Sequence, residues 1–281
     1  MKGKIFFEND RGRMEMLLGG TGPVRISALS GFGNPEKNYS AAFFAGKPGQ
    51  KTTGAVAKAR TMVISGDIWG DRSLSEKMLK ILDGPGRLTL DFENKKREIF
   101  CNQADLSLGA RRGGYTSFVL TLVADEVYFT DTFQTRTAVF AREDMLLKDI
   151  VFPCVFTRKN TEATIEIFGE VNVEPVIYIY NYADNPENKE KGIIVQNITT
   201  GQKITLETGM TKNECITIDI KNRKVTSSDK GDILHLISDD TFLSKFWLKP
   251  GLNHLCAWHG NTGEDISVIL SYRSSYREGI F

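Results

Sequence analysis

Apolar side chains alternate with polar ones along most of this chain, and this period of two is the feature that most restricts its fold. Residues 88–92 and 118–124 show the alternation clearly, which is typical of a strand with one buried face. A polar turn at 93–96 and a further run at 97–101 follow the first of these strands and complete the pattern of a hairpin. The sequence therefore predicts a mainly β protein.

One segment departs from this period. Ser73 and Glu76 have the spacing of a capping box, in which each residue hydrogen-bonds the other's backbone amide. Gly84–Pro85 supplies a helix end followed by a residue that forbids continuation. Four apolar side chains between these signals fall on one helical face, namely Leu74, Met78, Ile81 and Leu82. We expect one helix over about 73–83 inside an otherwise β-rich first half.

The second half contains short alternating runs separated by turns, which favours a β-sandwich or jelly roll. The runs are Ile165/Ile167, Val176/Tyr178/Tyr180, Ile204/Leu206, Ile216/Ile218/Ile220, Leu234/Leu236 and Ile266/Val268/Leu270/Tyr272. A chain of 281 residues accommodates two domains. Because the strand rhythm lapses between 131 and 160, we place the boundary near Ala138 and expect domains over 1–138 and 139–281.

Charge and hydropathy exclude several classes of protein. Lys and Arg total 36 and Asp and Glu total 35, a near balance that argues against a general nucleic-acid binder. The apolar runs are too short for a signal peptide or a membrane span, so we expect synthesis in a cytoplasm and no membrane insertion. The four cysteines lie far apart and are expected to be buried free thiols: Cys101, Cys154, Cys215 and Cys256.

Several weak motifs occur in an order that resembles the distal tail proteins of siphophages, often called Dit. In the first half they are Gly66–Trp69, the helix, Gly84–Gly86, Arg97–Cys101 and Ala124–Phe129. In the second half they are Gly169–Glu170 leading to Pro175–Ile177, Asn197–Gly201, Phe246–Asn253 and Tyr272–Gly279. The resemblance covers nearly the whole chain.

This resemblance implies a fold and a function. It implies an N-terminal β-rich tail-ring domain with one α-helix, followed by a C-terminal galectin-like β-sandwich that holds the adhesion device. It also implies a homo-hexameric ring at the tail tip of the virion, which joins the tail tube protein to the tail-associated hub protein and to receptor-binding or adhesion proteins. DNA would pass through the ring without sequence recognition.

Two basic turns are candidate assembly loops. Residues 46–60 have the Gly, Lys and Thr content of a solvated hairpin loop, or equally of an arm that becomes ordered against a neighbouring subunit or the tube. The turn at 111–114 is better explained as an ordinary loop, with a subunit contact as the alternative. The candidate interface residues are Lys47, Gly49, Lys51, Lys58, Arg60, Arg111 and Arg112.

Signatures of chemistry are missing from the sequence. It contains no Gly-x-Ser-x-Gly elbow and no Walker loop. His254 and Cys256 would share one face of a strand, but a structural zinc site needs four ligands. We therefore expect no enzyme activity, no cofactor and no metal.

Two alternative functions stay open. One is a carbohydrate-binding host-recognition module, for which candidate aromatic side chains are Trp247, Trp258, Tyr178 and Tyr180. The other is the equivalent part of a contractile or bacteriocin-like tail.

Overall fold

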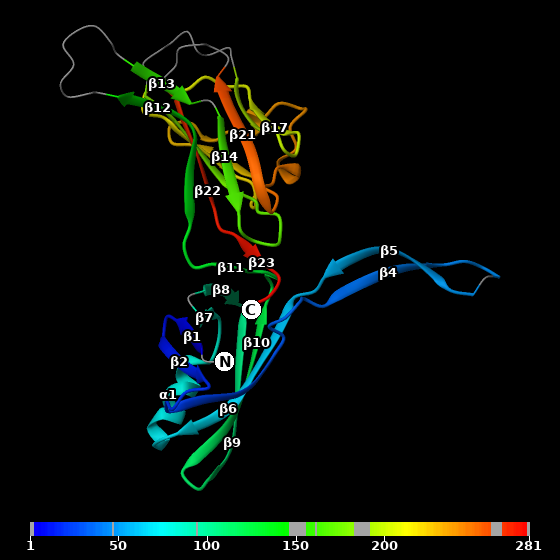
Figure 1. Ribbon diagram of the computed structural model, residues 1–281, viewed down its shortest axis with the longest axis vertical. Helices are drawn as coiled ribbons and strands as arrows, with labels where there is room; N and C mark the ends of the chain where they lie inside the picture. Colours follow the sequence, from blue (N-terminus) through cyan, green and yellow to red (C-terminus); the bar gives the residue numbers. More distant parts are fainter. Residues whose placement is uncertain are drawn as a thin grey trace. The chain divides into compact units, whose positions relative to one another are not determined.

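The computed structural model describes residues 3–46, 48–93, 95–145, 156–160, 162–182, 192–259 and 266–279. The chain is mainly β with one α-helix, as the alternation predicted, and it divides into two compact units (Figure 1). The first unit comprises Met1–Thr132 together with Ser275–Phe281, and the second comprises Phe133–Ser274. In the described part of the chain, no helix is long and apolar enough to cross a membrane.

The first unit is built on a ten-stranded sheet. Its strands lie in the order β23 (Ser275–Tyr276), β11 (Phe129–Asp131), β8 (Lys95–Cys101), β7 (Gly86–Phe92), β1 (Gly3–Asn9), β2 (Gly12–Leu18), β3 (Val24–Ser30), β6 (Arg60–Trp69), β10 (Tyr115–Ala124) and β9 (Gln103–Arg112). All neighbours are antiparallel except β2 and β3, which share a short parallel pairing. The buried side chains of β1, β2, β7 and β8 form one core cluster with those of β6 and β10.

The helix α1 spans Arg72–Ile81 and covers part of this core, with Met78 and Ile81 buried. The predicted apolar face is therefore confirmed, but the predicted capping box is wrong. Asp71 is the N-cap residue and makes no side-chain cap hydrogen bond. Because β6 already ends at Trp69, the chain enters the helix early, and Ser73 lies within its first turn. Gly84 has the positive φ of 103° expected after a helix end.

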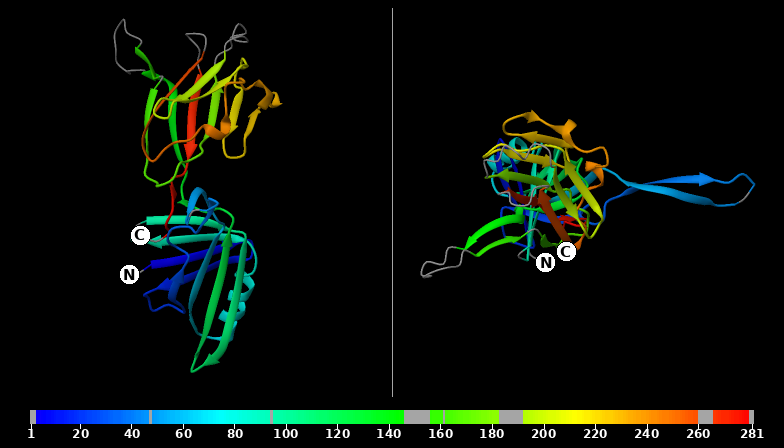
Figure 2. Two further views of the ribbon diagram at one scale, coloured as in Figure 1. Left: turned by 90° about the vertical axis from the view of Figure 1, so that its right-hand side faces the viewer. Right: turned by 90° about the horizontal axis from the view of Figure 1, so that it is seen from above.

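Two further strands of the first unit lie outside the large sheet. β4 (Lys37–Phe43) and β5 (Gln50–Ala57) form a separate two-stranded antiparallel sheet. Figures 1 and 2 show this hairpin extending away from the ten-stranded sheet. We call residues 37–57 the arm.

The second unit contains two sheets. One has the order β13 (Phe156–Asn160), β12 (Thr135–Met145), β22 (Ile266–Tyr272), β15 (Val176–Asn181), β18 (Cys215–Asp219), β19 (Lys224–Ser227) and β20 (Gly231–Asp232). The other has the order β14 (Glu162–Ile167), β21 (Gly251–His259), β16 (Ile193–Asn197) and β17 (Gln202–Leu206). Buried apolar side chains from both sheets form one core, so the unit is a β-sandwich (Figure 2, left).

Two local expectations for the second unit need correction. In β15 the buried side chains are Ile177 and Ile179, whereas Tyr178 and Tyr180 on the opposite face are half-buried. Both faces of this strand are apolar, so alternation alone could not decide which one is inside. Leu234–Leu236 is a 3₁₀ turn (η2) rather than a strand, and a second 3₁₀ turn, η3, spans Leu243–Lys245.

The chain leaves the first unit and later returns to it. Ala138, the predicted boundary, lies within β12 of the second unit, whereas the two units divide between Thr132 and Phe133. The last residues, which the sequence assigned to the second domain, pair with the first unit instead, because β23 lies antiparallel to β11. We call Ser275–Gly279 the strap.

Candidate assembly surfaces

Both strands of the arm are largely exposed. Every residue of β4 and β5 is exposed except Ala41, Ala42 and Ala57, which are half-buried. Gly49 and Lys51, two of the predicted interface residues, lie near its tip and are exposed. Lys47 lies outside the described residues. Since an isolated two-stranded hairpin is at best marginally stable in water, such an arm is the kind of element that another surface stabilises.

The register of the arm places Tyr39 and Phe43, two of its aromatic residues, on one face. Tyr39 is opposite Ala55 and Phe43 is opposite Gln50, and side chains two residues apart on a strand share a face. These rings are 67% and 77% exposed. Val56, which is 71% exposed, pairs with Asn38 and lies on the opposite face. This aromatic face was not among the predicted site features, although Tyr39, Ala41 and Phe43 alternate with Asn38, Ser40 and Ala42 in the sequence.

The arm is also basic. Residues 37–58 contain four lysines and no carboxylate, in a chain whose net charge is only +1. At the base of the arm, Lys58 is exposed and lies 3.6 Å from the carboxylate of Glu36. The Lys58 amide also donates to the Glu36 carbonyl at 2.9 Å. These two contacts bring the two ends of the arm together.

Arg60 is not a surface residue, although the sequence placed it on an assembly loop. Its exposed fraction is 4%. Its guanidinium donates to four backbone carbonyls, those of Gly31 (2.8 Å), Gly33 (2.7 Å), Val127 (2.8 Å) and Arg277 (2.6 Å). Burial lowers the pKa of Arg60. The single cation satisfies carbonyls from three separate segments of the first unit, and that long-range role is invisible to local sequence pattern.

A second arginine holds the strap. The buried Arg97 donates to the carbonyl of Glu278, and its guanidinium lies 3.9 Å from the centre of the Tyr276 ring. The Tyr276 hydroxyl is 3.4 Å from a carboxylate oxygen of Asp131. The strap is therefore an integral part of the first unit, joined to it by strand pairing and by charge-assisted hydrogen bonds.

The turn between β9 and β10 carries the last two predicted interface residues. Arg111 and Arg112 are both exposed, and the Arg111 guanidinium donates to the Gly70 carbonyl at 3.1 Å. Arg111 also lines an open groove of about 430 Å³ together with Leu79 of α1 and Leu108 of β9. The structure thus places Arg111 at a groove beside α1, and it leaves Arg112 exposed on the same turn.

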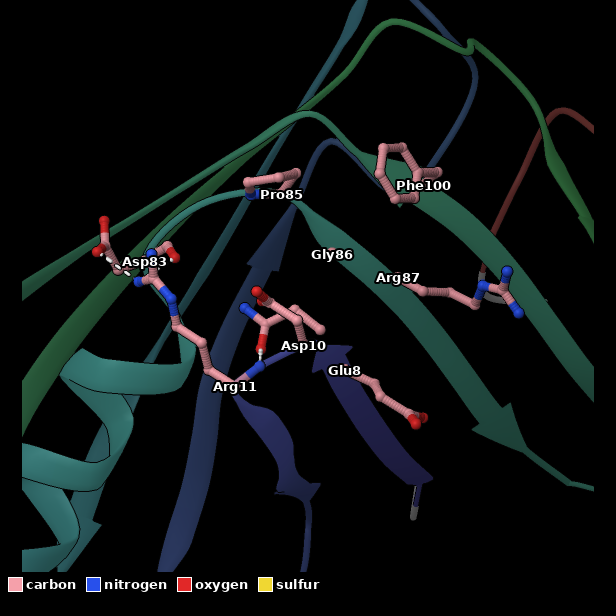
Figure 3. A pocket seen from close by; sticks show the side chains of 9 residues that line it. Glu8, Asp10, Arg11, Asp83, Pro85, Gly86, Arg87 and Phe100 are labelled. Atoms are coloured by element: carbon pink, nitrogen blue, oxygen red, sulfur yellow. Dashed lines mark hydrogen bonds and ion pairs between the residues drawn. The ribbon is translucent and has the colours of Figure 1, made fainter.

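A second groove, of about 510 Å³, lies where the β1–β2 turn meets the loop after α1 (Figure 3). Arg11 forms an ion pair of 2.7 Å with Asp83, and this contact raises the pKa of Arg11. Phe100 of β8 forms another part of the lining and is 48% exposed. The lining contains both signs of charge, which is typical of a solvated protein surface and does not select one small ligand.

The candidate aromatic residues for carbohydrate binding and the candidate metal ligands lie in the second unit. Trp247 is half-buried and Trp258 is 37% exposed, so only part of either ring is available to a ligand. His254 is 3.1 Å from the Thr164 hydroxyl. Among the residues that the structure describes, no three His, Cys, Asp or Glu side chains gather into a metal-ligand group.

The thiols were expected to be buried. Cys101 and Cys256 are buried and Cys215 is half-buried, and all three are free. Burial raises the pKa of the Cys101 thiol to about 12. Cys154 lies outside the described residues. Thiols with a raised pKa are poor nucleophiles, so Cys101 acts as a packing residue.

The chain resembles known proteins both in the sequence of its second unit and in its overall fold. Residues 169–276 match the family model for the C-terminal domain of the siphovirus-type tail component. The crystal structure of the Dit protein of phage SPP1 has a TM-score of 0.65 at 14% identity, covering 89% of this chain and 92% of that one. No curated protein matches the chain.

Weaker matches are two structures of the phage P2 baseplate in its activated conformation. The structure with Ca has a TM-score of 0.44 at 10% identity, and the structure with Sr has 0.44 at 11%; each covers 96% of this chain and 98% of that one. Residues 169–276 therefore match the C-terminal domain of the siphovirus-type tail component, and the chain shares its fold with the Dit protein of phage SPP1.

Proposed function

We propose that this protein forms a ring, with six copies, at the tail tip of the virion, and that the ring joins the tail tube to the tail-tip hub and the adhesion device. The observation that carries the proposal is the exposed arm with its aromatic face, on a chain that shares its fold with SPP1 Dit. That protein is described as a paradigm of the hub adsorption apparatus in phages that infect Gram-positive bacteria.

The arm suits a head-to-tail contact between subunits. A ring of identical subunits needs two different surfaces on each copy, one of which receives the other. The arm supplies one of them, because Tyr39 and Phe43 remain in water in the single chain. Exposed aromatic side chains on a narrow hairpin favour insertion into a neighbouring surface. In the assembled ring the arm would contact the next subunit or the tube.

The other parts of the chain have assigned roles in this proposal. The first unit builds the ring, whose lumen lets DNA pass without sequence recognition, in keeping with the net charge of +1. The second unit holds the receptor-binding or adhesion proteins. The partners are therefore further copies of this chain, the tail tube protein, the tail-associated hub protein and the adhesin.

Negative-stain imaging of the purified full chain tests the proposal. We expect a six-fold ring with an axial hole. A variant that lacks residues 48–57 removes β5 but leaves both cores intact, so it should remain folded and monomeric. Lys77→Gln is the control, because it changes one exposed basic residue of α1 outside the arm and outside the candidate interface residues. Full rings from the deletion variant would show that the arm is not the subunit contact.

A second measurement addresses the carbohydrate-binding alternative. The wild-type protein is incubated with purified host cell wall, and binding is measured against concentration. We expect no saturable binding, because the proposed ring leaves host recognition to the attached adhesin. Saturable binding would favour the host-recognition alternative.

A further inference from the structure

The direction of the arm depends on the two segments that join it to the rest of the first unit. Within the described chain, β4 and β5 pair with each other and with no other strand. The arm therefore points wherever its two flanking segments hold it: residues 31–36, the first root, and residues 58–59, the second root. A hairpin on free roots would sample many directions, and each subunit would lose that freedom on assembly.

Both roots meet at Arg60. This residue begins β6, directly after the second root, and its guanidinium donates to the carbonyls of Gly31 and Gly33 in the first root. The same guanidinium lies 4.7 Å from the centre of the Phe129 ring, and the Phe32 and Phe129 rings stack at 6.3 Å. A buried cation thus joins the two roots inside the core of the first unit.

The strap contacts both Arg60 and the first root. Arg60 donates to the Arg277 carbonyl at 2.6 Å. The Gly279 backbone amide donates to the Phe32 carbonyl at 2.8 Å, and the Asn34 side-chain amide donates to a carboxylate oxygen of Glu278 at 3.2 Å. Three consecutive residues of the strap therefore contact the first root, either directly or through Arg60.

The first root has little room to move while these contacts persist. Gly31 has a positive φ of 82°, and a Cβ built there would lie 2.1 Å from the Thr61 carbonyl oxygen. The backbone is thus packed directly against β6, next to Arg60. Such close approach and left-handed conformation are available only to glycine.

We propose that Arg60 and the strap form a latch that fixes the direction in which the arm leaves the first unit. Arg60 is then a positioning residue for the subunit contact and makes no contact with the neighbouring copy itself. This inference rests on the proposed function of the arm. The latch presents the aromatic face in one direction before assembly, which reduces the entropy lost when the ring closes.

Single-molecule energy transfer tests the latch on the full chain. One dye is attached through a non-natural residue at position 49, near the arm tip, and the other at position 105, an exposed site in β9. We expect a narrow distance distribution for the wild type. Arg60→Met keeps an apolar stem and removes every donor, so it should broaden the distribution. It should also raise the concentration needed for ring formation by about tenfold or more, because an arm without a fixed direction loses more entropy on assembly.

Three further variants separate positioning from stability. Arg60→Lys restores one charge and should give an intermediate width. Asn34→Ala removes a single exposed contact and is expected to fold normally, with a smaller broadening. Lys77→Met on the exposed face of α1 is the matched control and should leave the distribution unchanged. Thermal unfolding is recorded for each variant, so that Asn34→Ala and Arg60→Lys decide the matter if Arg60→Met does not fold.

The possible outcomes distinguish this inference from the proposed function. A broad distribution in the wild type, or narrow distributions in all the folded variants, would overturn the latch even if rings form. Broadening in the variants without any ring from the wild type would support the latch and refute the proposed function. Broadening together with weaker ring formation would support both.

Discussion

The aromatic face of the arm gives a prediction with a magnitude. Replacing Tyr39 and Phe43 by Ser removes two rings that are 67% and 77% exposed in the single chain. Full burial of a large apolar side chain contributes roughly 1.5–3 kcal/mol. The part still available for burial therefore contributes about 1–2 kcal/mol for each ring, or about 2–4 kcal/mol for each subunit contact. That free energy corresponds to a loss of roughly 30-fold to 1,000-fold in contact affinity.

The assay compares assembly with stability. Sedimentation velocity over a range of concentrations measures how much of each variant is assembled, and thermal unfolding measures the stability of the monomer. Because both rings are exposed in the monomer, we expect its stability to change by no more than about 0.5 kcal/mol. Assembly should shift to much higher concentration.

Val56→Ser is the matched control. Val56 is as exposed as the aromatic residues, but the register of β4 and β5 places it on the opposite face. We expect it to affect assembly far less. Unchanged assembly of the Tyr39→Ser/Phe43→Ser variant would refute the argument, and an equal effect of Val56→Ser would show that the contact does not select a face.

Two further predictions concern buried groups. The buried carboxylate of Glu214 accepts from the Thr211 amide at 2.7 Å and from the Lys230 ammonium at 3.2 Å. Glu214→Gln should therefore lower the free energy of unfolding of the second unit, measured by denaturant titration, by about 1–3 kcal/mol, whereas Glu207→Gln at an exposed site should leave it unchanged. Burial raises the pKa of Cys101 from 9.0 to about 12, so the folded state holds this proton more tightly than the unfolded state. The stability contributed by Cys101 is complete below about pH 9 and is lost as the pH rises towards 12, which unfolding curves at increasing pH measure; alkylation of folded Cys101 at neutral pH would contradict this account.

Local pattern predicted those parts of the fold in which one face is clearly apolar. The alternation at 118–124 placed Phe118, Leu120 and Leu122 inside, and the structure buries all three. The face of α1 followed from the spacing of its apolar residues for the same reason. In β15, by contrast, isoleucines and tyrosines occupy alternate positions, so both faces looked apolar and the pattern could not choose between them.

Other features depend on contacts between distant residues. Arg60 looks like a loop residue in the sequence because it follows a Gly- and Lys-rich stretch. Its burial results from carbonyls that lie 29 and 217 positions away along the chain. The return of the strap to β11 is likewise a pairing between residues 129 and 276. No periodicity in either segment encodes such contacts.

The return of the strap bears on how this kind of chain can diversify. The second unit is an insertion whose two ends are adjacent, since β11 pairs with β23 and Thr135 of β12 is opposite Tyr272 of β22. An insertion between paired strands can be enlarged or exchanged while the host sheet keeps the same register. Everything between Phe133 and Ser274 can therefore change while β11 keeps its pairing with β23, and under the proposed function the second unit would diversify without any change in the arm.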